Sequence, residues 1–156
     1  MPEPTERTIE LQLARLVRGL EAVRQSPGRR AAMDRAVYLL LERLADGPRP
    51  AGQLAAELHL DQSTVSRQLA ALERQGLSRR VLDPAGGRAA VIELSPEGER
   101  VLDLERAARA DRVTQLLRRW NDRDRRELAR LLARLNDAID ERMSAGGQRS
   151  PVRPAE

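Results

Sequence analysis

The chain has 156 residues, of which 40% are hydrophobic and 33% charged, and this composition suits one folded domain with extensions rather than a membrane protein. It contains no cysteine and one histidine, His59, which excludes disulfides, thiol chemistry and a metal site built from cysteines or several histidines. All 28 basic residues are arginine, and the net charge of +4 permits a nucleic-acid partner without demanding one. Since no apolar run is long enough to span a bilayer and the N-terminus is unlike a secretory signal, we expect a cytoplasmic protein.

The first predicted element is a helix over residues 5–25. Apolar side chains recur in it at spacings of four and three, at Ile9, Leu13, Leu16, Leu20 and Val23. This spacing is typical of a seam between two helices. Aromatic residues make up only 1% of the chain, so the core of a single copy has little apolar area per side chain, and we expect self-association.

Two shorter helices are predicted next, over residues 31–45 and 51–58. Gly47 and Pro48 separate them, because a glycine just past a helix with a proline beyond it commonly ends the helix. The apolar stripe of the first of these helices consists of Met33, Val37, Leu40 and Leu44.

A fourth helix carries the strongest local signals. Asp61 is well placed to cap its first turn, and Gly76 stands where a left-handed residue ends a helix. Its predicted buried stripe consists of Val65, Leu69 and Leu72. A short turn from His59 to Asp61 joins it to the third helix, and this order predicts a helix-turn-helix.

The pattern then changes from helical to extended. Short β-prone segments at residues 79–82 and 89–94 flank the run from Asp83 to Gly87, whose adjacent glycines indicate a hairpin turn. A small β-hairpin, or wing, is therefore predicted to follow the fourth helix.

Two further helices are predicted after the hairpin. Ser95 caps the first of them, which should run to about residue 120 with Pro96 in its first turn. Asn121 or Asp122 caps the second, whose apolar positions are Leu128, Leu131, Leu132, Leu135, Ile139 and Met143. We expect residues 144–156, rich in glycine, proline and serine, to form a disordered tail.

A helical projection gives the fourth helix an outward face opposite its buried stripe. The face carries Ser63, Arg67, Ala70 and Arg74, and the predicted DNA-contacting set also includes Gln62, Thr64 and Ser66. Hydroxyls, a small methyl group and guanidiniums can read base edges or bind phosphates, and we expect Arg67 to contact a base and Arg74 a phosphate. The alternative is an ordinary solvated face, which the order of helix, turn, helix and hairpin argues against.

Three arginines of the predicted hairpin extend this surface. Arg88 follows the glycine turn and is placed to enter a minor groove. For Arg79 and Arg80, contact with phosphate and plain strand-edge charge are equally good interpretations. Between residues 61 and 88 five arginines face three acidic residues, a net charge of +2, so strong DNA affinity should require two copies of the surface.

Residues 54–98, LAAELHLDQSTVSRQLAALERQGLSRRVLDPAGGRAAVIELSPEG, resemble the MarR family of bacterial transcription regulators. The shared features are an S-x-V-[ST]-R-like segment, L-E-x-x-G-L, an Asp-Pro start to the wing, a wing arginine and L-[ST]-x-x-G. The resemblance extends over residues 9–143 and implies a mainly α fold with a small β-hairpin wing. It implies one domain over residues 5–143, in which residues 29–95 form the winged helix-turn-helix lobe and residues 5–25 and 96–143 the dimerisation helices.

The resemblance further implies a homodimer that binds double-stranded DNA. The apolar seams agree with it on the dimerisation residues, which are Ile9, Leu13, Leu16, Leu20, Leu128, Leu132, Leu135 and Ile139. A two-fold axis implies half-sites about one helical turn apart. Two positions depart from the family pattern. The acidic residue usually found two positions before the wing arginine is Gly86 here, so Arg88 is less restrained than usual, and Pro50 stands where a capping Ser or Thr is more usual before the third helix.

A small lipophilic or phenolic effector is also implied by the resemblance, in a crevice between the dimerisation helices and the lobe. Tyr38 and Trp120 are candidates to line that crevice, although ordinary packing is the simpler interpretation of both. No metal, cofactor or membrane partner is expected.

The leading hypothesis is a sequence-specific DNA-binding regulator, a repressor at a pseudo-palindromic operator, released by a small-molecule effector. The alternative is a winged-helix protein-interaction module that does not bind DNA, because fold does not fix function. An enzyme is not expected, since the sequence has no glycine-rich phosphate loop, no histidine paired with a nucleophile and no metal-ligand spacing.

Overall fold

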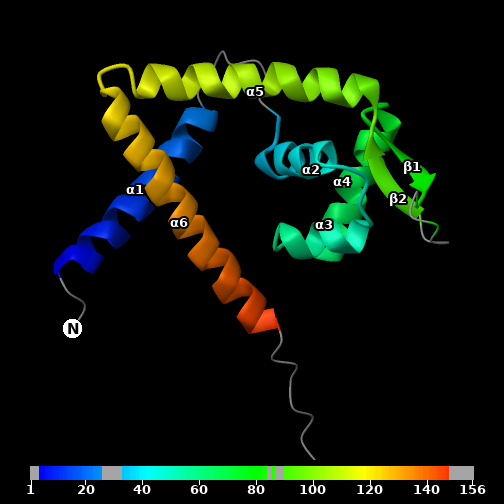
Figure 1. Cartoon of the computed structure of the whole chain (residues 1–156), viewed down its shortest axis with the longest axis horizontal. Helices are drawn as coiled ribbons and strands as arrows, with labels where there is room; N and C mark the ends of the chain where they lie inside the picture. Colours follow the sequence, from blue (N-terminus) through cyan, green and yellow to red (C-terminus); the bar gives the residue numbers. More distant parts are fainter. Residues whose placement is uncertain (1–3, 26–32, 84–85, 87–89, 148–156) are drawn as a thin grey trace, which may run out of the picture. The chain divides into compact units, whose positions relative to one another are not determined.

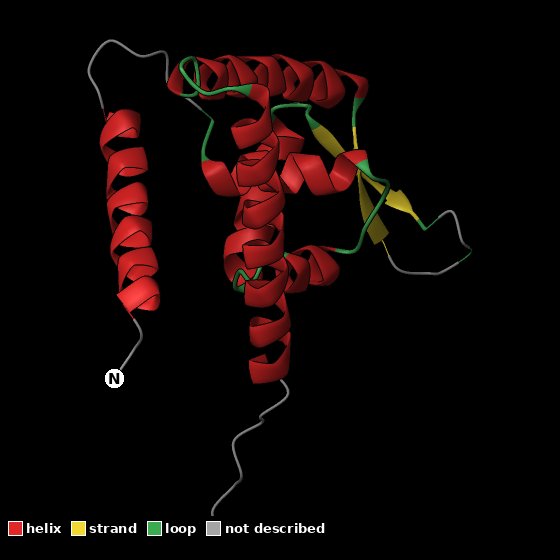
Figure 2. Cartoon of the chain, turned by 60° about the vertical axis from the view of Figure 1, so that its left-hand side comes forward, coloured by secondary structure: helices red, strands yellow, loops and turns green. Residues whose placement is uncertain are grey.

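The computed structural model describes residues 4–25, 33–83, 86 and 90–147. It is mainly α-helical with one small hairpin, which confirms the predicted fold class (Figure 1, Figure 2). The elements are α1 (Pro4–Gln25), α2 (Arg35–Ala45), α3 (Ala51–Glu57), α4 (Gln62–Arg74), β1 (Ser78–Leu82), β2 (Ala90–Leu94), α5 (Pro96–Leu116) and α6 (Asp122–Gly147). The chain divides into two compact units, residues 1–34 with α1 and residues 35–156 with all other elements.

The hydrophobic core of the second unit lies among α2, α3, α4, the hairpin and the first turns of α5. Its buried side chains are Leu40, Leu41, Leu44, Leu54, Ala55, Val65, Leu69, Leu72, Leu77, Val91, Ile92, Leu94 and Leu102. Helix α2 contacts both β2 and α5, while α4 contacts α3 and β1. The core is aliphatic throughout and holds α4 from one side, leaving the other side of that helix free.

A third chain segment extends the two-stranded sheet. Strands β1 and β2 pair antiparallel, with Arg79 opposite Glu93. On the other edge of β2, the backbone of Arg49 exchanges two hydrogen bonds of 2.9 Å with that of Ile92. Pro48 and Pro50 flank Arg49 and lack an N–H, which limits this third strand to a single bridge. Nothing in the sequence around Arg49 predicts this bridge.

Both ends of α4 are closed as the sequence predicts. The Asp61 carboxylate accepts a hydrogen bond from the Thr64 N–H at 2.9 Å. At the other end Gly76 has φ +71°, and the N–H groups of Gly76 and Leu77 donate to the carbonyls of Glu73 and Leu72. This is the paired bond pattern of a Schellman cap, which needs a left-handed residue where Gly76 stands.

Three helix boundaries differ from the prediction by more than one residue. Helix α2 begins at Arg35, directly after the cap-type residue Asp34, and not at residue 31, which lies outside the described residues. Helix α5 ends at Leu116 because the chain turns there, and the Trp120 N–H donates to the Leu117 carbonyl at 2.8 Å. Asn121, one of the two candidate caps of the last helix, is its cap and accepts from the Asp124 N–H at 2.9 Å.

The third difference concerns the expected tail. Residues 144–147 contain no proline, and the hydrogen bonds of α6 continue through them to Gly147. They are therefore helical, contrary to the expectation of disorder from residue 144. Residues 148–156 lie outside the described residues.

The two C-terminal helices project from the lobe. Helix α5 runs along the top of Figure 1, with the hairpin at one end and the start of α6 at the other. Beyond Leu102, none of the described side chains is fully buried. Apolar residues of α6 such as Leu132 and Ile139 remain 40% and 48% exposed. No described helix is long and apolar enough to cross a membrane.

Candidate nucleic-acid interface

Helix α4 has one buried and one exposed face, divided as the helical projection requires. Val65, Leu69 and Leu72 are buried, with at most 2% of each exposed. Of the predicted DNA-contacting residues, Gln62, Ser63, Ser66, Arg67 and Arg74 are exposed, and Thr64 and Ala70 are half-buried. All seven residues are therefore at least partly accessible on α4, and together we call them the α4 face.

Asp61 organises the first turn of the α4 face. The Ser63 and Thr64 hydroxyls donate to its two carboxylate oxygens, at 2.5 Å for Ser63. These two hydroxyl bonds and the Thr64 N–H hold the pKa of Asp61 far below its usual range. Because each hydroxyl has one proton, Ser63 and Thr64 are left as hydrogen-bond acceptors toward any further partner.

Arg67 and Arg74 supply positive charge to the α4 face. An Arg67 Nη2 group donates to the Thr64 hydroxyl at 3.4 Å, which ties the guanidinium loosely to the first turn. In the described part of the chain, neither arginine forms an ion pair within 4.0 Å. Their charges are available to an anionic partner.

The arginines of β1 are compensated by carboxylates of the protein itself. Arg79 pairs with Glu93, its neighbour across the hairpin. Arg80 Nε lies 3.1 Å from a carboxylate oxygen of Glu73 on α4. These pairings support the interpretation of Arg79 and Arg80 as strand charges more than as free phosphate ligands.

The hairpin tip is described only in part. Gly86 has φ +89°, and its N–H donates to the Asp83 carbonyl at 3.0 Å, which closes a turn that suits glycine. Arg88, the predicted minor-groove arginine, lies outside the described residues.

The turn between α3 and α4 contains His59 in a left-handed conformation, with φ 51°. Its N–H and that of Leu60 donate to the Ala56 and Ala55 carbonyls, so the end of α3 is also a Schellman cap. The imidazole Nε2 lies 3.1 Å from a carboxylate oxygen of Asp140 on α6. His59 thus has a structural contact, and among the described residues no acidic or histidine cluster could hold a metal ion.

Tyr38, a candidate effector residue, belongs to a polar network that joins α2 and α5. The Arg109 guanidinium lies over its ring, 4.1 Å from the centroid. A hydrogen bond to Glu42 raises the pKa of the Tyr38 hydroxyl. Glu42 is itself bound by Arg106, which holds the pKa of Glu42 below its usual value.

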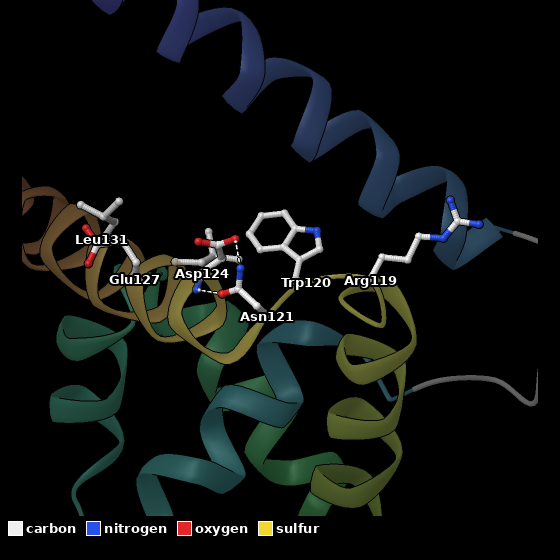
Figure 3. A pocket seen from close by; sticks show the side chains of 7 residues that line it. Arg119, Trp120, Asn121, Asp124, Glu127 and Leu131 are labelled. Carbon is white, nitrogen blue, oxygen red and sulfur yellow. Dashed lines mark hydrogen bonds between the residues drawn. The ribbon is translucent and has the colours of Figure 1, made fainter.

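Trp120, the other candidate, lies where α5 gives way to α6. Trp120 is 44% exposed and borders an open cavity of about 560 Å³ (Figure 3). The other lining residues are Arg119, Asn121, Asp124, Glu127, Leu128 and Leu131. Tyr38 does not line this cavity, so the structure does not bring the two candidates together.

The predicted dimerisation residues form apolar stripes on α1 and α6. Ile9, Leu13, Leu16 and Leu20 are 37–50% exposed on α1. On α6, Leu132 and Ile139 are exposed, and Leu128 and Leu135 are half-buried. Within each unit these stripes face solvent.

The known proteins that this chain resembles are regulators of transcription. Residues 35–77 match the model of a family described as bacterial regulatory protein, arsR family. Over 132 residues the chain is 35% identical to YxaD of Bacillus subtilis (strain 168), an uncharacterized HTH-type transcriptional regulator, and the match covers 84% of this chain and 92% of YxaD.

Solved structures extend the similarity beyond the helix-turn-helix. A probable transcriptional regulator from Pseudomonas aeruginosa has 29% identity and a TM-score of 0.60, covering 82% of this chain and 94% of that one. A MarR family protein from Bacillus stearothermophilus has 24% identity and a TM-score of 0.68, covering 89% and 98%. The PcaV transcriptional regulator of Streptomyces coelicolor, solved with its natural ligand, has 25% identity and a TM-score of 0.58, covering 88% and 94%.

Proposed function

The chain belongs to the HTH-type transcriptional regulators, and we propose that, as a regulator of the MarR type, it binds a pseudo-palindromic operator as a homodimer and represses transcription there. The observation that carries the proposal is the α4 face. It combines two arginines without ion pairs in the described chain, hydroxyls and one small residue on a helix whose other side is fixed in the core. Arginine can pair with guanine through two hydrogen bonds, and a small residue permits close approach to the groove.

The homodimer is supported by the apolar stripes. Side chains such as Leu132 and Ile139 lie exposed on a long helix, and burying such residues is a usual source of dimer stability. Two α4 faces related by a two-fold axis would read two half-sites in opposite orientation. The domain division follows from this assignment: residues 29–95 form the DNA-binding lobe, and residues 5–25 and 96–143 the dimerisation helices.

Repression requires only that the bound dimer occupy a promoter, and release requires an effector that favours another dimer geometry. The cavity beside Trp120 supports an effector, since about 560 Å³ suits a small ligand. Trp120 is the single tryptophan of the chain, so its fluorescence reports on this cavity alone. Titration with a phenolic carboxylate should quench it saturably, and an unchanged spectrum would exclude this cavity for that class of ligand.

Selection of binding sequences from random duplex DNA tests the DNA-binding proposal. We expect an enriched pseudo-palindrome whose half-sites lie about 10 base pairs apart, centre to centre. The Arg67→Ala variant, put through the same selection, should lose the preference at one position in each half-site. If no sequence is enriched with the unaltered protein, the protein-interaction alternative becomes the better account of the fold.

A further inference from the structure

The end of α4 and the start of α5 are joined by one side chain. The Ser95 hydroxyl donates to the Gly76 carbonyl at 2.6 Å and accepts from the Gly98 N–H at 2.9 Å. The first bond reaches the residue that ends α4, and the second caps the first turn of α5. Ser95 is only 9% exposed; its bond to Gly98 is buried and its bond to Gly76 is partly buried.

The backbone makes the same connection beside it. The Ser95 N–H donates to the Leu77 carbonyl at 3.0 Å, at the point where the two ends of the hairpin meet. The hairpin from Ser78 to Leu94 therefore leaves and returns at one place. The two helices that it separates in sequence are held together there by two hydrogen bonds, and the bond from the Gly98 N–H fixes the Ser95 side chain in place.

Gly98 removes the remaining space at this contact. A Cβ atom built on Gly98 would lie 2.0 Å from the Leu77 carbonyl oxygen and 2.8 Å from a Leu94 methyl carbon. No side chain fits at that distance, so the first turn of α5 rests directly on the backbone that follows α4. Close backbone contact leaves little room for the two helices to tilt against each other.

We infer that Ser95 is a positioning residue for operator recognition, because it fixes the angle between α4 and α5. We call Gly76, Leu77, Ser95 and Gly98 the α4–α5 joint. The inference rests on the proposed function, in which α5 leads to the dimer interface and α4 reads DNA. The joint then sets the separation of the two α4 helices, and with it the half-site spacing that the dimer accepts.

A small change of angle at the joint moves the far end of α4 by a large distance. Helix α4 has 13 residues and is about 20 Å long, and the joint lies at one end of it. A tilt of ~10° at that end moves the other end by ~3 Å, which is close to the rise of one base pair. The far end carries Ser63 and Thr64. A looser joint should therefore reduce the preference of the dimer for one half-site spacing before it weakens the contacts within one half-site.

The test measures the preference for half-site spacing with the whole chain of 156 residues. The duplexes carry the selected palindrome with native spacing, with one base pair inserted or removed between the half-sites, or with one half-site only. Ser95→Ala should reduce the preference for native spacing about three- to tenfold, the equivalent of one hydrogen bond. Its affinity for the duplex with a single half-site should stay within about twofold of the unaltered protein.

Three further variants separate the joint from helix capping. Ser95→Asp can still cap α5 but cannot donate to the Gly76 carbonyl, so it should lose the preference for native spacing as Ser95→Ala does. It takes the place of Ser95→Ala in the test if the alanine variant folds poorly. Ser95→Thr keeps the hydroxyl and should keep the spacing preference. Glu97→Ala removes an exposed ion pair with Arg100 from the first turn of α5 without touching the joint, and it should also keep the preference.

Equal spacing ratios in the unaltered protein, Ser95→Ala and Ser95→Asp would overturn the inference while leaving the proposed function standing. Failure of the unaltered protein to select any palindrome is a different result, because it overturns the proposed function itself. A spacing preference lost in Ser95→Ala and retained in Ser95→Thr supports the joint.

Discussion

At the scale of single residues, the arginines of the interface divide into two pairs. Arg67 and Arg74 have no carboxylate within ion-pair distance in the described chain, whereas Arg79 and Arg80 each have one. An exposed ion pair contributes little to stability, but it reduces the net charge that a phosphate group meets. The two pairs should therefore differ in what their removal does to DNA binding.

Arg67→Ala should weaken binding to the selected operator by about 1–3 kcal/mol and relax the base preference at one position of each half-site. Arg80→Ala is the matched control, since it removes a guanidinium already paired with Glu73. It should cost less and change no base preference. Fluorescence anisotropy with operator variants measures both effects, and equal losses in the two variants would contradict the distinction.

Asp61 is an acidic group at the edge of the α4 face. An Asn side chain can still accept the Thr64 N–H, but it has one oxygen where the Asp61 carboxylate offers two to the Ser63 and Thr64 hydroxyls. Asp61→Asn should therefore lower the melting temperature less than Asp61→Ala does. Removal of a negative charge beside the DNA should tighten binding to every duplex, whatever its sequence. A melting temperature that falls as far as that of Asp61→Ala would show that the Asn side chain does not replace the cap.

At the scale of elements, Glu42 connects α2 of the lobe to α5. Arg106 holds its pKa below the usual value, so Glu42 stays ionised to lower pH in the folded chain than in the unfolded chain. Its contribution to stability is complete above its unfolded pKa and is lost as the pH falls through its folded pKa.

Glu42→Gln should therefore be less stable than the unaltered protein near neutral pH, and the difference should shrink as the pH falls below about 4. Glu141→Gln, an exposed position on α6, is the control and should show no such convergence. Thermal unfolding over a pH series measures the difference. A difference that stays constant down to pH values of about 2–3 would contradict the role of the Glu42–Arg106 pair.

The elements that could be predicted from the sequence are those fixed by local chemistry. Asp61 and Gly76 mark the ends of α4 because a cap and a left-handed residue act within one turn. The backbone pairing of Arg49 with Ile92 could not be predicted, since it depends on where β2 lies in the folded chain. The left-handed conformation of His59 could not be predicted either, because the sequence of a turn does not show which of its residues has a positive φ.

The same limit applies to the candidate interface. The helical period predicted the α4 face, since burial of one side of a helix determines the other. The partners of Arg79 and Arg80 depend on the register of the two strands and on the contact between β1 and α4. Both involve segments that are distant in the sequence, so a local sequence pattern does not predict them. The α4–α5 joint likewise joins residues that the whole hairpin separates in sequence.

For the whole molecule, recognition of a pseudo-palindromic operator requires two copies of the chain. Ile139→Glu places a charge in the apolar stripe of α6 and should weaken the dimer by roughly 2–4 kcal/mol, because burying an unpaired charge is costly. Leu82→Glu changes another exposed leucine, on β1, and should leave the dimer intact. Sedimentation velocity distinguishes the two, and an unchanged dimer in Ile139→Glu would exclude this stripe as the interface.

Loss of the dimer should carry over to DNA binding. A single lobe has a net charge of only +2 between residues 61 and 88, so a monomer should bind the operator hardly better than unrelated DNA. The Ile139→Glu variant should therefore lose operator affinity although its α4 face is unchanged.

The central claim is that the α4 faces of a dimer read a DNA sequence. The most direct test is the ratio of dissociation constants for the selected palindrome and for a scrambled duplex of the same composition, measured at several salt concentrations. We expect a ratio of at least about 10³ at physiological salt, with both affinities falling as salt rises. A ratio near one at every salt concentration would contradict it.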